Sequence, residues 1–375
     1  MWENSRTLFV IPGADSAQML YGYLCCCRIL EDEKMKRIFL MLFVLMLYVS
    51  SGMAMELELA AVREKTHPTI LADEEMAAAF SAAANGANSL SVGSAGLLYG
   101  DEMGILDAVV RGDVALGQVS VRTLAQRVPT LDVFSLPYLI NGTDHLQAVL
   151  FGVTGDSLKG IIEEKMPEVK VLGFYNCGGR CFYSRKQVAS PFDMPGTTFC
   201  AEQTEAMVHF LTAMGAKHQW LARHTVYSAL FQGVIDGAEN DLISLVYLGD
   251  YDPARYVLLD YHTFAPDVLL VSKAVYDRLD ESAQTALLQA AKNAEMLEWE
   301  IAAKQEAEAL DKLHEMGCSF SYMDNGVREA FIRMVREPAN ELGGKSVYEM
   351  ADSRNSELVK EIQKMGESYP PQDNP

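Results

Sequence analysis

The chain has 375 residues, of which 49% are hydrophobic and 22% charged, and its formal net charge is −20 at pH 7. Its length exceeds the roughly 250–300 residues at which a single hydrophobic core stops growing, so two lobes are expected, and its ordinary composition excludes a disordered chain. The negative charge excludes nucleic acid as a partner, because both molecules carry the same sign of charge.

The first part of the chain has the order of a secretory signal peptide. Basic residues in the segment 34–37 precede the apolar run 38–49, and small residues follow up to Ala54. The run is shorter than the roughly 20 residues of a transmembrane helix, so cleavage is favoured over the alternative of an uncleaved anchor. We interpret residues 1–54 as the signal peptide region of a periplasmic protein. Met35 directly precedes Lys36 and Arg37, so residues 1–34 are interpreted as an over-long start, with a long basic region of the signal peptide as the alternative.

Four cysteines remain after the expected cleavage, namely Cys177, Cys181, Cys200 and Cys318. An even number suggests pairing in an oxidising compartment, although a chain of this length builds a core without disulfides. The spacing of Cys177 and Cys181 has no second pair of ligands, so no zinc site is predicted. No cofactor is expected.

Strands and helices alternate along the first half of the mature chain. In order, we expect a strand at 55–61, a helix over 72–84 that ends at Asn85-Gly86, a strand at 89–92, a helix over 102–111 that ends at Gly112, and a strand at 114–121. This alternation with short connections predicts βαβ units and an α/β fold with mostly parallel sheets.

The second half contains a break, a returning strand and a long helix. In order, we expect a strand at 169–175, a break at Asn176-Cys177-Gly178-Gly179, a strand at 192–201, helices over 205–214 and 225–231, a strand at 266–273, and a helix over 280–316 between Asp280 and Gly317. The last helix would span about 55 Å at 1.5 Å per residue, which is longer than one lobe.

The break and the returning strand predict two lobes that interleave in sequence. Residues 54–177 and 266–305 are assigned to lobe I, and residues 178–265 and 306–365 to lobe II, with 366–375 as a tail. The expected fold is a two-lobed clamp of the kind found in periplasmic binding proteins, with the long helix spanning both lobes.

Several segments form a characteristic set, namely Phe134-Ser-Leu-Pro-Tyr-Leu-Ile140, Leu172-Gly-Phe-Tyr-Asn-Cys-Gly-Gly-Arg180, Tyr227-Ser-Ala-Leu-Phe-Gln-Gly-Val-Ile-Asp-Gly-Ala-Glu-Asn240, Tyr261-His262 and the helix start Leu279-Asp-Glu-Ser-Ala-Gln284. Together they resemble the TRAP-type (tripartite ATP-independent periplasmic) solute-binding proteins of the dicarboxylate-receptor family. The resemblance implies capture of a small organic acid in a cleft between the lobes and delivery to the subunits of a membrane permease. It implies no catalysis. The alternative is a periplasmic sensor or sequestering module of the same fold without a transporter.

The resemblance also identifies candidate ligand-binding residues. In the family, an arginine in a Gly-Leu-Lys-Ile-Arg-like segment binds the ligand carboxylate, and Cys200 stands at that position here. A neutral thiol offers neither the charge nor the planar fork of a guanidinium. Arg223 offers a replacement charge. Arg180 and Asn240 are retained family positions expected to face the cleft, and Arg180 is the leading partner for a carboxylate.

Other candidates follow from position in the fold. Ligands of open α/β sheets bind beyond the carboxyl ends of the strands, which favours Ser120 and Arg63. Tyr227 would either pack at a helix edge or cover the ligand. Glu239 is a candidate whose carboxylate suits a structural acceptor. His262 is interpreted as structural, and Trp220 is expected in the core rather than as a stacking wall.

Enzymatic interpretations find little support in the sequence. Cys200 and one of His209, His218 and His224 could form a nucleophile and a base, but no local signature surrounds them. The segment 152–160 contains glycines but lacks the Gly-Lys-Ser/Thr ending of a phosphate-binding loop. We therefore expect a binding protein and not an enzyme.

Overall fold

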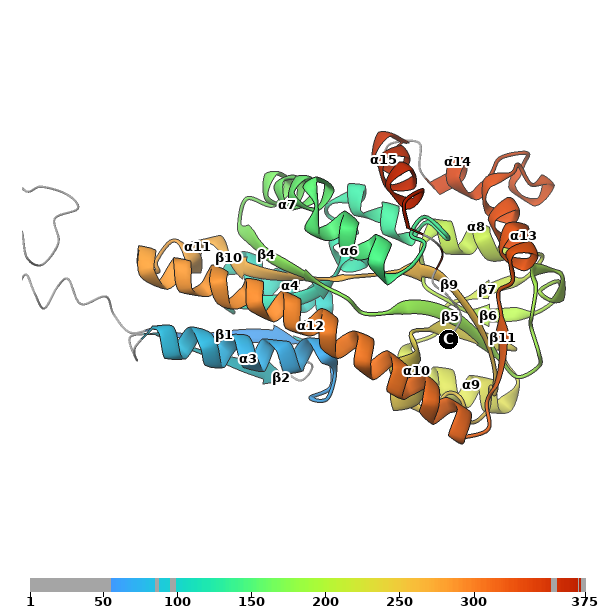
Figure 1. Cartoon of the computed structure of the whole chain (residues 1–375), viewed down its shortest axis with the longest axis horizontal. Helices are drawn as coiled ribbons and strands as arrows, with labels where there is room; N and C mark the ends of the chain where they lie inside the picture. The colour runs from blue at the N-terminus through green and yellow to red at the C-terminus, as the bar shows by residue number, and fades with distance from the viewer. Residues whose placement is uncertain (1–54, 85–87, 95–98, 352–355, 370, 372–375) are drawn as a thin grey trace, which may run out of the picture. The chain divides into compact units, whose positions relative to one another are not determined.

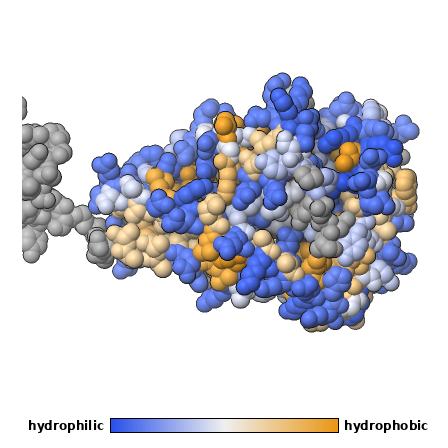
Figure 2. All heavy atoms as spheres, in the orientation of Figure 1, coloured by the Kyte–Doolittle hydropathy of each residue, from blue (hydrophilic) through white to orange (hydrophobic). Residues whose placement is uncertain are grey.

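Two β-sheets organise the computed structural model, which describes residues 55–375 except 85–87, 95–98, 352–355, 370 and 372–375 (Figure 1). The predicted signal peptide and the predicted Asn85-Gly86 helix stop lie outside the described residues. Within the described residues, no helix is long and apolar enough to cross a membrane. On the face drawn in Figure 2 the surface is mostly hydrophilic, with smaller hydrophobic areas between.

The first sheet has the strand order β2-β1-β3-β10-β4. Its strands are β1 (Met55–Ala61), β2 (Asn88–Ser94), β3 (Leu116–Ser120), β4 (Val169–Tyr175) and β10 (Asp267–Ser272). Parallel pairing joins β1 to β2 and β3, while β10 runs antiparallel between β3 and β4. The returning strand therefore pairs within the first sheet, as the sequence predicts.

The second sheet has the strand order β11-β9-β5-β8-β6-β7. Its strands are β5 (Gly179–Ser184), β6 (Thr198–Cys200), β7 (Lys217–Gln219), β8 (Gly237–Asn240), β9 (Tyr256–Phe264) and β11 (Ser319–Tyr322). β5 runs antiparallel to both β8 and β9, so both sheets are more mixed than the alternation of elements predicts.

One predicted strand is much shorter than expected. Only Thr198–Cys200 of the segment 192–201 is extended, and a 3-10 turn occupies Pro191–Asp193. Pro191 and Pro195 have no backbone N–H for a strand ladder, which explains why pairing starts only after them.

Helices cover the sheets. Those around the first sheet are α3 (Pro68–Ala83), α4 (Glu102–Arg111), α5 (Val121–Ala125), α6 (Thr143–Phe151), α7 (Val153–Lys165) and α11 (Lys273–Tyr276). Those that follow strands of the second sheet are α8 (Glu205–Ala213), α9 (Val226–Gln232), α10 (Leu242–Leu248), α13 (Asn325–Arg336), α14 (Val347–Ala351) and α15 (Ser356–Gly366).

The local capping signals explain where α4 starts and stops. The Asp101 carboxylate accepts a hydrogen bond from the Gly104 amide at 2.9 Å, as an N-cap does. Gly112 ends the helix with φ 75°, a left-handed conformation that glycine adopts without steric cost. The bounds of this helix agree with those predicted from the sequence.

The long helix α12 (Glu281–Glu315) runs past both sheets (Figure 1). Asp280 caps its start by accepting from the Ala283 amide at 2.8 Å. Along its length it packs against α3 and β4 beside the first sheet and against α10 beside the second. Two chain crossings, from β4 to β5 and from β9 to β10, also connect the sheets.

Both sheets bury large apolar side chains. Leu59, Phe80 and Leu287 lie in a cluster of the first sheet, α3 and α12. In the second sheet the Phe182 ring lies 5.3 Å from that of Phe199 and 6.0 Å from that of Phe210, measured between centroids. These clusters hold the strand ends that form the site described below.

Candidate ligand-binding site

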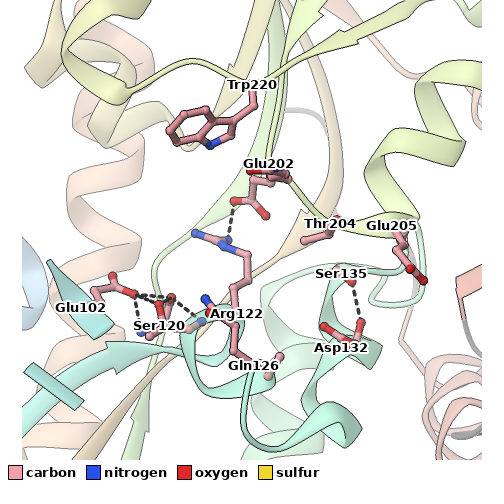
Figure 3. A pocket seen from close by; sticks show the side chains of 14 residues that line it. Glu102, Ser120, Arg122, Gln126, Asp132, Ser135, Glu202, Thr204, Glu205 and Trp220 are labelled. Carbon is pink, nitrogen blue, oxygen red and sulfur yellow. Dashed lines mark hydrogen bonds and ion pairs between the residues drawn. The ribbon is translucent and has the colours of Figure 1, made fainter. Parts of the chain in front are cut away.

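A polar cavity of about 740 Å³ lies where the carboxyl end of β3 faces the segment after β6 (Figure 3). Its volume falls in the range of small-molecule sites. One wall comes from α4, β3, α5 and the following turn, and the other from residues 202–206 and Trp220. The lining residues are Glu102, Ser120, Arg122, Thr123, Ala125, Gln126, Asp132, Ser135, Glu202, Gln203, Thr204, Glu205, Ala206 and Trp220.

Arg122 bridges the two walls. It lies in the first turn of α5, and its Nη1 is 2.5 Å from Oε1 of Glu202, which follows β6 of the other sheet. The two side chains are 26% and 13% exposed, so the ion pair is largely shielded from water. The sequence predictions missed Arg122, although the strand-end rule that favoured Arg63 after β1 applies equally to a residue just after β3.

Glu102 forms a fixed acceptor on the same wall. Its Oε2 accepts from the Ser120 amide at 3.1 Å, from the Thr123 hydroxyl at 2.6 Å and from the Ser120 hydroxyl. Burial raises the pKa of Glu102, but the nearby Arg63 charge and these hydrogen bonds outweigh it, so the pKa is lowered. Glu102 is therefore ionised at neutral pH. Ser120 lines the cavity, where the strand-end rule places it.

Arg180 lies behind the cavity, in a network of acceptors. Its Nη1 donates to Oδ1 of Asn240 at 2.9 Å, its Nη2 donates to the Glu239 carbonyl at 3.0 Å, and its Nε pairs with the Glu239 carboxylate. The same Nε is 3.0 Å from Oε1 of Glu202. The predicted residues Arg180, Glu239 and Asn240 are thus brought together, but none of the three is among the residues that line the cavity.

The charges of this network decide the protonation of its carboxylates. Burial raises the pKa of Glu239, but the charges of Arg180 and His262 outweigh it, and the pKa is well below its usual range. Glu239 also accepts from the Glu202 amide at 2.9 Å, in line with the structural role predicted for it. Burial raises the pKa of Glu202, because the opposing charges of Arg122 and Arg180 compensate only in part.

His262 is buried between two carboxylates. Its Nδ1 lies 2.9 Å from Asp260 and its Nε2 lies 3.7 Å from Glu239. Burial lowers the pKa of His262, but these carboxylates more than compensate and raise it to about 9. The imidazolium therefore acts as a counter-charge inside the second sheet, which agrees with the structural role expected from the sequence.

Four other candidates lie away from the cavity lining. Arg63 pairs with Asp267 at 3.1 Å, and Arg223 pairs with Asp250 at 3.3 Å. Tyr227 donates to Asp252 at 3.0 Å on an exposed helix, where its ring stacks on another aromatic ring. Cys200 is buried at the end of β6, and burial raises the pKa of its thiol. The four cysteines of the described residues are free thiols.

The expectation that Trp220 lies in the core is wrong. Its side chain is 57% exposed and lines the cavity on the same side as Glu202 (Figure 3). The reason is its place just after β7, an edge strand that pairs only with β6. An edge strand leaves one side without a neighbouring strand to cover such a residue.

The described residues offer no metal-binding group of three or more His, Cys, Asp or Glu side chains. The imidazole of His218 lies 3.1 Å from the Ala201 carbonyl and 3.0 Å from that of Glu202, so it is held by the backbone. What the cavity offers is one arginine, several carboxylates, hydroxyl groups and an aromatic wall. Such groups can donate and accept hydrogen bonds and supply both signs of charge.

Two α/β lobes with a polar cavity between their strand ends define the class of periplasmic solute-binding proteins. The family model of the bacterial extracellular solute-binding proteins, family 7 (DctP), matches residues 59–346. The chain belongs to this family, whose members include the TRAP-type solute-binding proteins.

Individual relatives agree with this assignment. A solute-binding protein from Chromohalobacter salexigens is 28% identical over 198 residues, which are 52% of this chain and 58% of that relative. The alignment thus spans less than two thirds of the relative's length.

Among solved structures, a TRAP periplasmic solute-binding protein from Pseudomonas putida F1 with bound D-glucuronate has 25% identity and a TM-score of 0.73. The match covers 82% of this chain and 96% of that one. An apo, open TRAP solute-binding protein from Citrobacter koseri has 25% identity and a TM-score of 0.72, over 82% and 97% of the two chains.

Proposed function

We propose that this protein is a periplasmic receptor that captures a small carboxylated sugar between its lobes and delivers it to a TRAP-type permease, without catalysing a reaction. The observation that carries the proposal is the guanidinium of Arg122, which projects from α5 across a polar cavity of about 740 Å³. The relative from Pseudomonas putida F1 holds D-glucuronate, a sugar with one carboxylate and several hydroxyls.

The groups around the cavity suit such a ligand. Guanidinium groups bind carboxylates through paired hydrogen bonds, and Arg122 supplies one in the cavity lining. Glu102 is ionised and held by Ser120 and Thr123, so it can accept hydrogen bonds from sugar hydroxyls. Trp220 offers a flat apolar face for a sugar ring.

Glu202 occupies the place that we assign to the ligand carboxylate. One oxygen of Glu202 lies 2.5 Å from Arg122 and 3.0 Å from Arg180, so a single acceptor is shared by two guanidiniums. A ligand carboxylate that binds Arg122 would displace Glu202 toward Arg180. Arg122 then takes the role of the family arginine that Cys200 replaces, with Arg180 behind it.

The transport cycle gives the lobes their function. We assign residues 54–177 and 266–305 to lobe I and residues 178–265 and 306–365 to lobe II. Rotation about the β4–β5 and β9–β10 crossings would open the cavity, with Gly178 at the first crossing in a left-handed conformation (φ 78°). Residues 1–54 would direct export and be removed.

A thermal-shift screen of the exported protein tests the ligand class. The panel pairs each sugar acid with its neutral sugar, for example D-glucuronate with D-glucose. A ligand at 100 times its dissociation constant stabilises a protein by about 2.7 kcal/mol, so a true ligand raises the melting temperature clearly. Stabilisation by the acids alone supports the proposal, and stabilisation by the neutral sugars alone contradicts it.

Uptake of the acid that binds best tests delivery and the absence of catalysis. Cells that express the receptor together with its permease should accumulate the radiolabelled acid, and cells without the receptor should not. The acid recovered from the purified receptor should be chemically unchanged. Binding without any receptor-dependent uptake would instead support a sensor or a sequestering module.

A further inference from the structure

A second cavity, of about 540 Å³, lies between α13, α15 and the segment before α6. It shares no lining residue with the cavity between the lobes. Two arginines of α13 line it, Arg328 and Arg336, together with the apolar side chain of Ile332 between them. Residues four apart lie on one face of a helix, so both guanidiniums belong to the face of α13 that borders this cavity.

Arg328 is an unusual arginine in this chain. Its side chain is 8% exposed, and within the described residues no carboxylate forms an ion pair with it. Its Nη2 is buried without a hydrogen-bond partner among these residues, and its guanidinium lies 5.8 Å from the centre of the Tyr138 ring. Buried charges in proteins are normally paired, as Arg122 and Arg180 are.

Arg336 adds a second positive charge to the same cavity. Its Nη2 lies 3.5 Å from the Tyr138 carbonyl, and its guanidinium is 5.7 Å from the centre of the Tyr348 ring. No ion pair is found for Arg336 among the described residues either. Burial lowers the pKa of Arg328, the charges of Tyr138 and Asp260 offset this only in part, and repulsion from Arg336 adds to the lowering. In a chain with net charge −20, carboxylates are abundant, yet none of those described lies within ion-pair distance of either arginine.

We propose that this cavity is a second binding site, which takes a small oxyanion such as phosphate or a short carboxylate between Arg328 and Arg336. An oxyanion matches the planar, multiply donating guanidinium and supplies the missing counter-charge. Two exposed carboxylates also line the cavity, Glu329 and Glu367, and they would repel a large polyanion. The site therefore selects a small anion. The proposal does not depend on the ligand of the cavity between the lobes.

Isothermal titration with inorganic phosphate, in a buffer with constant chloride and ionic strength, tests this proposal. The wild-type protein should bind one phosphate. Arg336→Gln should weaken this binding about tenfold, the typical effect of losing a hydrogen bond to a charged group. Arg333→Gln is the matched control, because Arg333 is an exposed arginine of the same helix that does not line the cavity. It should leave phosphate binding unchanged.

Further titrations distinguish this site from the cavity between the lobes and identify its anion. Arg328→Gln should abolish phosphate binding. If that variant does not fold, the Arg336→Gln variant, which changes an exposed side chain, still tests whether phosphate binds in this cavity. A titration with succinate in place of phosphate distinguishes a carboxylate site from a phosphate site, and tighter binding of either anion supports the proposal. Arg122→Ala should not change phosphate affinity. The proposal is overturned if neither anion binds, if Arg333→Gln weakens binding as much as Arg336→Gln, or if Arg122→Ala removes it.

Discussion

Replacing Glu202 with glutamine should strengthen the binding of a carboxylated ligand. The Glu202 oxygen that lies 2.5 Å from Arg122 and 3.0 Å from Arg180 occupies the position that we assign to the ligand carboxylate. In the wild type the ligand must displace this oxygen and bind close to a second negative charge. Glutamine keeps the size of the side chain and removes its charge, so this competition ends.

The magnitude follows from the distance and the exposure. Two like charges 4 Å apart repel by about 4 kcal/mol at an effective dielectric constant of about 20. Because Glu202 is 13% exposed and can move toward Arg180, we expect less than half of this repulsion to remain, about 1–2 kcal/mol. The dissociation constant should therefore fall by a factor of about 5–30.

Isothermal titration of the best acid into the wild type and the Glu202→Gln variant measures this change. Glu205→Gln is the control, because Glu205 lines the same cavity but is exposed and has no ion pair among the described residues. If Glu202→Gln weakens binding instead, Glu202 is a direct acceptor for the ligand and the assignment of its position is wrong.

The same group predicts the effect of pH. Burial raises the pKa of Glu202 above its ordinary value, although Arg122 and Arg180 oppose this. As the pH falls from neutral toward that raised pKa, Glu202 takes up a proton and no longer competes with the ligand. Wild-type affinity for an acid should rise over this range, and the Glu202→Gln variant should show a flatter profile. Identical profiles would contradict the competition.

Three further predictions concern binding and stability. Arg122→Ala should weaken binding of the acid by about 2–5 kcal/mol in calorimetry. Arg127→Ala is the control, because Arg127 does not line the cavity, and it should leave binding unchanged. Equal losses in the two variants would refute the role of Arg122. Folding raises the pKa of His262 to about 9, so the protonated imidazole stabilises the folded state. This contribution to the free energy of unfolding is complete below pH ~6.5 and is lost as the pH rises through 9. The urea-derived free energy of unfolding should therefore fall by about 3 kcal/mol over that range, and a His262→Gln variant with the same decrease would exclude His262 as its source. Asp280→Ala should cost about 1 kcal/mol by removing the N-cap of α12, and Glu281→Ala should cost less; no loss in the first variant would refute the capping argument.

Local sequence signals predict the bounds of helices and strands better than they predict how the strands pair. Asp101 and Gly112 bound one helix, and Asp280 and Gly317 enclose another, because capping depends on residues a few positions apart. The interruption of regular structure at Gly178-Gly179 predicts the crossing between the sheets for the same reason. The hydrophobic pattern predicts β10 as a strand but does not give its direction. The strand runs antiparallel between β3 and β4, and its partners lie nearly 100 to 150 residues earlier in the chain, beyond the reach of a local signal.

The site is less predictable than the fold, because its groups come from distant segments. Arg122 and Glu202 meet only after two sheets have formed, so neither residue has a local pattern that identifies its partner. The exposure of Trp220 depends on β7 being an edge strand, which a sequence does not reveal before the strand order is known. The family resemblance predicts that Arg180 and Asn240 face the cleft, but neither lines the cavity, because carboxylates of the chain itself already neutralise the arginine.

The central claim is that the cavity between the lobes recognises a ligand through its carboxylate. The most direct test compares D-glucuronate with D-glucose, which differ at one carbon, by titrating each into the exported wild-type protein. We predict that the acid binds at least about 30-fold more tightly, which corresponds to about 2 kcal/mol for one charge-assisted contact with Arg122. Equal or tighter binding of glucose would contradict the claim.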